Sequence, residues 1–280
     1  MIHGRGGGGD DDNLIDLAKK AAESQYYPNS QVLYLDWKEA ANDGGQPPYG
    51  AAKRIRSVAQ WATNRLKELG IDPEKTILLA HSLGSYVASE IGRIGGKVKE
   101  LVALDPASSP GGTYDIDAHN PGTDRTIDFS NAATKSTALV VSDAESFGGL
   151  AGDNDKASSA NDSYIVHFTG YKEYGGFLDQ DTAIRNINKA ADYHKGVVGV
   201  FSDILSSASP PNPLIFPSTY FTFQNDRYDN IGIIHEERIF PRHEGRITVD
   251  LTNKDDPRIQ SLVYVGTDGD ERITWRPPSS

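Results

Sequence analysis

The sequence predicts an α/β fold in which helices cover both faces of a mostly parallel central sheet. Over the first two-thirds of the chain, short apolar segments alternate with longer amphipathic ones. Strands that alternate with helices form parallel βαβ units. The apolar segments are also unbroken, as in strands that are buried on both faces. With 280 residues, the chain can hold one large domain, or one of about 200 residues and a small appendix.

Five short apolar runs are the expected strands of this sheet. They lie at Val32–Leu35, Thr76–Ala80, Leu101–Leu104, Ala138–Val141 and Tyr164–Phe168. Apolar residues that recur at helical spacing predict helices between and after them. These helices lie at Gly50–Leu69, Gly84–Arg93, Ala183–Ala191 and His194–Leu205. The polar loops Ser108–Ser130 and Ala144–Ser163 have a length that is usually functional or disordered.

The pattern changes at residue 209, where the proline-rich segment Ser209–Pro213 is typical of a linker or a sharp turn. Beyond it, β-type alternation predicts short strands. They lie at Tyr220–Phe223, Arg246–Leu251, Leu262–Val265 and, more weakly, Arg272–Trp275. We therefore expect a first domain at residues 1–208 and a β-rich extension or small appended domain at residues 209–280.

The chain is acidic, with a formal net charge of −11 and an isoelectric point of about 5.1. This charge disfavours binding to nucleic acid, and no apolar run reaches the roughly 18–20 residues of a membrane span. The absence of cysteine excludes disulfides, zinc–thiolate sites and cysteine nucleophiles. No basic segment followed by an apolar one marks a signal peptide. Cytoplasm, leaderless secretion and a processed precursor all stay open as locations, and so does the oligomeric state.

The most informative segment runs from the expected strand Thr76–Ala80 through Ser82 into the next helix. It has the form small-x-Ser-x-Gly between a strand and a helix, which is the context of a nucleophile elbow. Such a tight turn needs small flanking residues, here Ala80 and Gly84. The turn is expected to aim the backbone N–H of Leu83 at the oxyanion that forms when the serine hydroxyl attacks a carbonyl group. We therefore predict that Ser82 is the nucleophile of a serine hydrolase with an α/β-hydrolase fold.

A serine nucleophile needs a base that takes its proton and an acid that orients the base. In α/β-hydrolases the chain order is serine, acid, histidine. Asp105 stands 23 residues after Ser82, at the carboxyl end of the next expected strand, where α/β sheets carry their chemistry. Asp143, after the following strand, is the alternative acid. The competing structural interpretation of Asp105 is a helix or turn cap before Pro106.

Seven histidines compete for the role of base. Five are set aside because they pack in the elbow, precede the oxyanion loop, follow the acid too closely or lie in the β-rich tail: His81, His3, His119, His235 and His243. His167 stands inside an expected strand, where it would belong to the core or to a face of the sheet. His194 precedes the last expected helix. The residues alone leave His167 and His194 as candidates.

Four segments resemble, in the same order, motifs of the pancreatic/lipoprotein lipase family. They are Ile2-His3-Gly4, Leu35-Asp36-Trp37 followed by a helix, Ala80–Ser85 (AHSLGS) and Leu104–Ala107 (LDPA). The resemblance covers roughly residues 1–206 and is strongest over residues 32–107. Ala80 departs from the leading glycine of the elbow, and without cysteine the disulfide-bounded lid of the animal lipases cannot form. The chain looks like a cysteine-free, bacterial-looking member of the family.

The resemblance implies a triad of Ser82, Asp105 and His194, because the family's acid falls on the Leu-Asp-Pro aspartate and its base precedes the last helix. It also implies that the Arg5 backbone N–H joins that of Leu83 in the oxyanion hole. The expected reaction is hydrolysis of a carboxylic ester, foremost a triacylglycerol or other lipid ester, through an acyl-enzyme and without a cofactor. Because the segment that resembles the oxyanion strand opens the chain, the first strands of the fold are expected to be missing.

Some lipases of this family hold a structural calcium ion in the loop after the acid. Here that loop carries four aspartates without a defined ligand pattern: Asp115, Asp117, Asp124 and Asp128. We interpret it as a solvated loop, with calcium as the alternative. The candidate lids are Phe147–Ser163 and Tyr171–Leu178.

The motifs indicate a reaction class and not an acyl chain or head group. A phospholipase A1 and a soluble carboxylesterase or thioesterase are therefore alternatives within the same chemistry. A lipase-like protein that binds a ligand without catalysis is the alternative of another class. Such proteins usually lose the triad, whereas serine, aspartate and histidine all stand here in the expected order.

Overall fold

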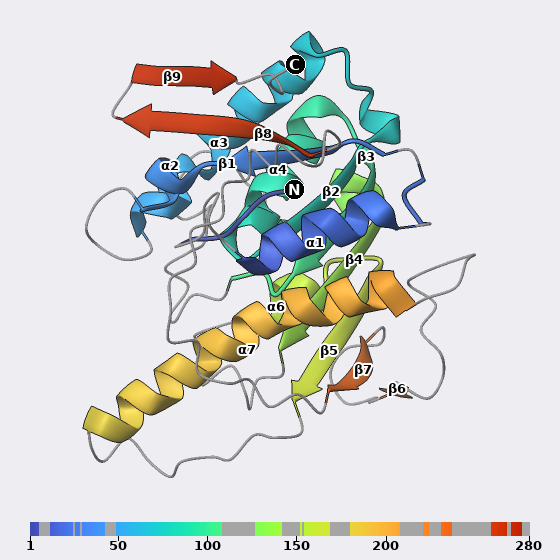
Figure 1. Cartoon of the computed structure of the whole chain (residues 1–280), viewed down its shortest axis with the longest axis vertical. Helices are drawn as coiled ribbons and strands as arrows, with labels where there is room; N and C mark the ends of the chain where they lie inside the picture. Colours follow the sequence, from blue (N-terminus) through green and yellow to red (C-terminus); the bar gives the residue numbers. More distant parts are fainter. Residues whose placement is uncertain are drawn as a thin grey trace.

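The computed structural model describes a mixed α/β arrangement, with strands in the middle and helices on both sides (Figure 1). The described residues are 1–5, 12–24, 26–28, 30–42, 49–107, 127–141, 152, 154–168, 180–207, 221–223, 231–236, 259–267 and 270–275. Within these ranges, no helix combines the length and the apolar character that a membrane crossing requires.

In the part of the chain that the structure describes, the strands form two sheets, one of six strands and one of three. Their bounds are β1 Val32–Asp36, β2 Ile77–His81, β3 Val98–Leu104, β4 Ala133–Val141, β5 Asp162–Phe168, β6 Phe221–Phe223, β7 Ile231–Glu236, β8 Ile259–Thr267 and β9 Asp270–Trp275. The larger sheet has the strand order β2-β3-β4-β5-β7-β6, and the smaller one has the order β1-β8-β9. Ile2 forms parallel bridges to Leu35 of β1 and to Ala80 of β2, and so joins the two sheets. From β2 to β7 every pairing is parallel, so the carboxyl ends of these strands share one edge of the sheet.

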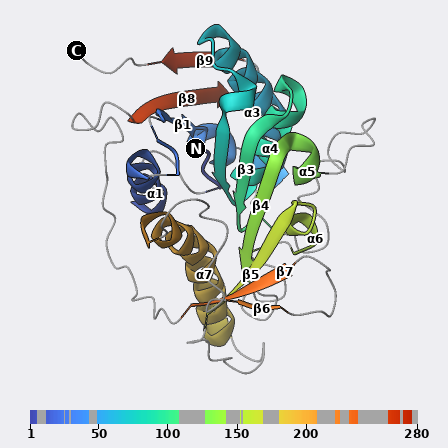
Figure 2. The ribbon, with the colours of Figure 1, turned by 90° about the vertical axis from the view of Figure 1, so that its right-hand side faces the viewer.

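Helices cover both faces of this sheet. Their bounds are α1 Asp12–Glu23, α2 Lys38–Asn42, α3 Tyr49–Glu68, α4 Leu83–Gly95, α5 Phe129–Ala132, α6 Asn154–Ala157 and α7 Gln180–Ser207, with a short 3₁₀ helix, η1, at Pro73–Lys75. Figure 2 shows α1 and α7 on one side of β3 and β4, with α4, α5 and α6 on the other. Parallel strands buried on both faces are the arrangement that their unbroken apolar sequences predict.

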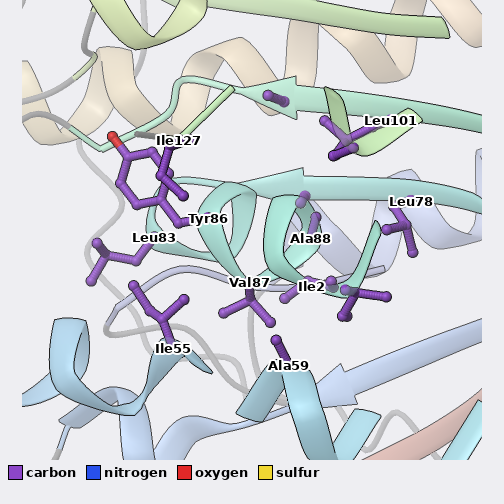
Figure 3. Close-up of a cluster of buried hydrophobic side chains, with 14 of the residues drawn as sticks. Ile2, Ile55, Ala59, Leu78, Leu83, Tyr86, Val87, Ala88, Leu101 and Ile127 are labelled. Carbon is purple, nitrogen blue, oxygen red and sulfur yellow. The ribbon is translucent and has the colours of Figure 1, made fainter. Parts of the chain in front are cut away.

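Two cores, one on each face, fix the orientation of the strands. On β2, Leu78 packs in the core shared with α3 and α4, whereas the next residue, Leu79, packs with α1 and α7. Figure 3 shows the first core, where Ile55 and Ala59 of α3 face Val87 of α4. Each fully buried aliphatic side chain of this kind stabilises a fold by about 1.5–3 kcal/mol. The register of β2, and with it the position of the residue after β2, is therefore strongly specified.

The five strands predicted before residue 208 are present as β1 to β5, and β3 and β4 begin earlier than predicted. The helices predicted at residues 50–69 and 84–93 correspond to α3 and α4. The prediction of two final helices, with His194 just before the second, is wrong. A single helix, α7, runs through His194 without a break. Its buried stripe, with Tyr193 before the predicted break and Val197 after it, continues into the core, so packing maintains the helix where the sequence suggested an end.

Strands beyond residue 208 pair with strands of the first region. β7 is parallel to β5, and β8 is parallel to β1. The strands predicted at residues 220–223, 262–265 and 272–275 correspond to β6, β8 and β9, while the one at Arg246–Leu251 lies outside the described residues. Whether residues 209–280 form a unit of their own stays a prediction.

Candidate active site

Ser82 occupies a sharp turn between β2 and α4. Its backbone has φ 56° and ψ −130°, a left-handed conformation that a residue with a side chain rarely adopts. Backbone hydrogen bonds hold the turn: the Ser82 N–H donates to Leu104 O of β3 at 3.0 Å, and the Ser82 carbonyl accepts from Ser85 N at 3.0 Å. This geometry is that of a strand–turn–helix elbow, and it leaves Ser82 at the carboxyl edge of the sheet, next to the N-terminus of α4.

Two glycines let the N-terminal segment approach this turn. A Cβ atom on Gly4 would overlap the Ser82 side chain and lie 2.9 Å from its Oγ. A Cβ atom on Gly84 would lie 2.5 Å from His3 O and 2.6 Å from Ile2 O. Both positions therefore need glycine for close approach. The result is that the Gly4–Arg5 peptide group starts beside the Ser82 hydroxyl.

Asp105 follows β3 directly, on the strand next to that of Ser82. Because His81 pairs with Leu104, the two residues that follow, Ser82 and Asp105, lie at the same edge of neighbouring strands. Asp105 is fully buried and also has a positive φ, of 45°. Its Oδ1 accepts a hydrogen bond from Val141 N at 2.8 Å. A buried carboxylate needs such partners, and the backbone of β4 provides one of them.

The second carboxylate oxygen of Asp105 contacts His194. Oδ2 is hydrogen-bonded to His194 Nδ1, although the two residues are 89 positions apart in the chain. The His194 side chain is 19% exposed, whereas that of Asp105 is not exposed at all. One ring nitrogen of His194 is thus fixed by a buried acid, and Nε2 is left for another partner. Among the side chains that the structure describes, His194 makes no hydrogen bond to Ser82 Oγ, and in ligand-free structures such bonds are often long.

His81, the residue before Ser82, contacts the base from the other side. Its Nε2 donates to the backbone carbonyl of His194 at 3.1 Å, and the two ring centroids are 4.4 Å apart. Burial, reinforced by the neighbouring His194, holds the pKa of His81 well below its ordinary value of 6.5. His81 is therefore a neutral hydrogen-bond donor that ties the elbow to α7. The sequence suggested only that it packs in the elbow.

The alternative base, the alternative acid and the candidate lids lie wholly or partly outside what the structure describes. His167 lies in β5, in register with His235 of β7, and its side chain is outside what the structure describes. The alternative acid Asp143, with His119 and His243, also lies outside the described residues, as do the candidate lid Tyr171–Leu178 and the first part of the candidate lid Phe147–Ser163. These alternatives stay predictions.

Of the four calcium candidates, only Asp128 falls within the described residues. It caps α5: its Oδ1 accepts from Ser130 N at 2.9 Å and from Asn131 N at 3.3 Å. N-caps of this kind stabilise a helix start by about 1 kcal/mol. Within the described ranges, no group of three or more histidine, aspartate or glutamate side chains is arranged to hold a metal ion.

A cavity of about 460 Å³ is lined by Val32 at the start of β1 and by Ile77 at the start of β2. Its lining reaches Ile2 and Leu79, but Ser82, Asp105 and His194 do not line it.

Two features that position the site were not predicted from the sequence. Trp37 donates its indole N–H to His3 O at 2.7 Å, and Gly152 lies so close to Asp105 that a Cβ there would overlap Oδ1. Trp37 belongs to the motif Leu35-Asp36-Trp37, so the sequence does mark this residue, although not its contact with His3. No local pattern marks Gly152, because its closeness to Asp105 comes from an antiparallel bridge with Ala107 that brings distant segments together.

No protein-family model matches the chain. Its sequence is similar to pancreatic lipase-related protein 2 of Mus musculus, with 32% identity over 109 residues. It is also similar to pancreatic triacylglycerol lipase of Sus scrofa, with 30% identity over 112 residues, and to inactive pancreatic lipase-related protein 1 of Homo sapiens, with 32% over 114 residues. Each match covers 38–39% of this chain and 22–24% of the relative, so the chain spans about a quarter of their length. These partial similarities support a lipase-like family.

Proposed function

We propose that the protein is a serine hydrolase of the α/β-hydrolase type that cleaves carboxylic esters. The observation that carries the proposal is the contact between Asp105 Oδ2 and His194 Nδ1 beside the strained turn at Ser82. A buried acid that fixes one nitrogen of a histidine is the arrangement that makes the other nitrogen a general base. The partial similarity to pancreatic lipases supports the same reaction class.

In the proposed reaction Ser82 Oγ attacks the ester carbonyl carbon while His194 Nε2 takes the hydroxyl proton. The charged imidazole that forms is stabilised by Asp105, which stays ionised. The tetrahedral intermediate then expels the alcohol, which receives the proton from His194, and leaves an acyl group on Ser82. A water molecule then attacks the acyl carbon while His194 Nε2 takes its proton. The bond from the acyl carbon to Ser82 Oγ breaks, His194 returns the proton to Oγ, and the carboxylic acid is released.

The negative charge on the former carbonyl oxygen needs hydrogen-bond donors that are in place beforehand. The Leu83 N–H at the start of α4 and the Arg5 N–H after Gly4 are the proposed donors. Leu83 follows the turn directly, and the helix N-terminus adds the favourable end of its dipole. The closeness of Gly4 to Ser82 supports the role of Arg5.

A lipid ester is the proposed substrate class, with a triacylglycerol as the first choice. The support is that one relative is named a pancreatic triacylglycerol lipase. A phospholipase A1 and a soluble carboxylesterase or thioesterase use the same chemistry and are the alternatives.

The test is hydrolysis of p-nitrophenyl esters from acetate to palmitate by the wild type and by Ser82→Ala. We expect turnover by the wild type, a loss of several orders of magnitude in the variant, and the highest kcat/KM on the longer acyl chains. Equal rates for the two proteins would exclude Ser82 as the nucleophile. A preference for acetate would replace the lipid substrate by a short soluble ester.

A non-catalytic role is the second candidate, because one relative with 32% identity is named inactive. In that case the wild type would bind a lipid ester without cleaving it. Isothermal titration with a non-hydrolysable ether analogue, beside the esterase assay, distinguishes the two: binding without turnover supports the non-catalytic role.

A further inference from the structure

His3 is fully buried at the beginning of the loop that carries Arg5, and polar groups surround its ring. Nδ1 lies 2.6 Å from the carbonyl oxygen of Gly4. Nε2 accepts the backbone N–H of Trp37 at 2.9 Å and lies 3.2 Å from Asp36 Oδ1. The ring also stacks against Tyr34 and Trp37, with centroids 5.9 and 5.8 Å away. A buried side chain with this many specific contacts is held in one orientation.

These contacts determine which nitrogen carries the proton. The Trp37 N–H always donates, so Nε2 must offer a lone pair to it in the neutral ring. The proton of the neutral ring then resides on Nδ1 and is donated to Gly4 O.

This hydrogen bond fixes the plane of the Gly4–Arg5 peptide group. A trans peptide is planar and directs its C=O and N–H to opposite sides, and no cis peptide occurs among the described residues. Because the Gly4 carbonyl points at the His3 ring, the Arg5 N–H points away from that ring. Gly4 itself lies against Ser82, so this N–H belongs to a peptide group that begins beside the Ser82 side chain.

Trp37 holds His3 in place through two hydrogen bonds. Its backbone N–H donates to His3 Nε2, and its indole N–H donates to the His3 carbonyl at 2.7 Å. Trp37 is fully buried at the end of β1, so it is itself rigidly placed. The loop is thereby tied to β1 by hydrogen bonds on two sides of one histidine.

We propose that His3 is a positioning residue that locks the Gly4–Arg5 peptide in the orientation that presents the Arg5 N–H to the oxyanion. The proposal rests on the proposed function, since it assigns a role in stabilising the tetrahedral intermediate. An oxyanion donor acts only in the transition state, so its misorientation lowers kcat and leaves KM unchanged. A loop that merely loses packing would instead lower stability and affect both constants.

The test compares two isosteric substitutions. In His3→Asn the side-chain amide nitrogen takes the place of Nδ1 and can still donate to Gly4 O. In His3→Gln the side-chain oxygen reaches the place of Nε2 and can accept from Trp37 N, but the donor to Gly4 is lost. Kinetics with p-nitrophenyl butyrate should show a kcat lowered about tenfold to a hundredfold in His3→Gln, within the range for oxyanion-hole losses, with KM unchanged. His3→Asn should stay within about threefold of the wild type.

The opposite order, with His3→Gln the more active variant, would overturn the proposal in favour of anchoring through Trp37. Thermal unfolding of both variants checks that each is folded. A second readout does not depend on activity: the ¹⁵N chemical shifts of the His3 ring should show a protonated Nδ1 in the wild type. An unprotonated Nδ1 would overturn the lock even in an active enzyme. An inactive wild type with a protonated Nδ1 would overturn the proposed function and leave the hydrogen bond in place.

Discussion

The nucleophile side and the base side of the site are held in different ways. Ser82 and Asp105 follow neighbouring strands whose residues pair one by one. Each donates its backbone N–H to the next strand, Ser82 to Leu104 O of β3 and Asp105 to Leu139 O of β4. His194 comes from a helix far along the chain and meets them through side-chain contacts with Asp105 and His81. The first arrangement is set by strand register, whereas the second depends on how α7 packs. The sequence is therefore more informative about Ser82 and Asp105 than about the base.

Removing the base should have the largest effect. In triads of this kind, loss of the histidine lowers kcat by about 10⁶, and we expect His194→Ala to lower it by at least about 10³. His167→Ala is the matched control, because His167 is the competing base, and it should keep the wild-type rate. Steady-state hydrolysis of p-nitrophenyl butyrate measures both. A near-normal rate in His194→Ala, with a loss in His167→Ala, would move the base to β5.

Asp105→Asn should have the next largest effect. The amide keeps a hydrogen-bond acceptor for Val141 N but no longer favours the His194 tautomer with a proton on Nδ1, so kcat should fall by about 10⁴. Asp72→Asn, at the exposed cap of η1, is the control and should leave kcat unchanged. If the two variants are equally active, Asp105 is a structural residue and Asp143 becomes the candidate acid.

The Arg5 amide can be removed with proline. Arg5→Pro lacks the backbone N–H, whereas Arg5→Ala retains it, so the two separate the amide from the side chain. We expect a kcat about 10²- to 10³-fold lower in Arg5→Pro with an unchanged KM, and a near-normal kcat in Arg5→Ala. A large loss in Arg5→Ala would assign the effect to the guanidinium group.

His81→Phe should have the smallest kinetic effect, a fall of about tenfold in kcat/KM, because it removes one neutral hydrogen bond to the backbone of His194. His81→Gln can still donate and should recover most of the rate. Wild-type activity in His81→Phe would show that α7 holds His194 without the elbow.

The same residue should also affect stability at low pH. Burial keeps the pKa of His81 well below 6.5 in the folded protein, while the unfolded chain binds a proton near that value. The unfolded state therefore binds more protons below pH 6.5, and this contribution to the free energy of unfolding is full above pH 6.5 and is lost as the pH falls. Urea unfolding between pH 5 and 7.5 should show the decline, at most about 1.4 kcal/mol per pH unit, and His81→Gln should reduce it. An identical slope in both proteins would assign the decline to other groups.

The difference between the nucleophile side and the base side explains which features of the site could be predicted from the sequence. Continuous apolar runs predicted β1 to β5, because strands buried on both faces carry the signal in every residue. The strand–turn–helix elbow was predicted as well, because its features are local: a strand, a helix, and small residues two positions before and after Ser82, namely Ala80 and Gly84. Asp105 could be proposed from its place at the carboxyl end of the next strand, with Asp143 as the alternative, and the resemblance of Leu104–Ala107 to a lipase motif favoured Asp105.

The environment of His194 could not be read in the same way. The sequence predicted one helix that ends at Ala191 and a second that ends at Leu205, but Tyr193 and Val197 pack in one core and the helix continues. The hydrogen bond from His81 and the closeness of Gly152 to Asp105 join residues far apart in the chain. Contacts of this kind arise from tertiary packing, for which a single sequence has no periodic signal.

The central claim is that Ser82 is a nucleophile activated by His194. It is tested most directly by reaction with a fluorophosphonate, which phosphonylates activated serines, followed by peptide mass spectrometry. If His194 activates Ser82, the wild type forms one adduct, on the peptide that contains Ser82, and the reaction is greatly slowed in His194→Ala. No adduct, or an adduct on another residue while Ser82 stays unmodified, would contradict it.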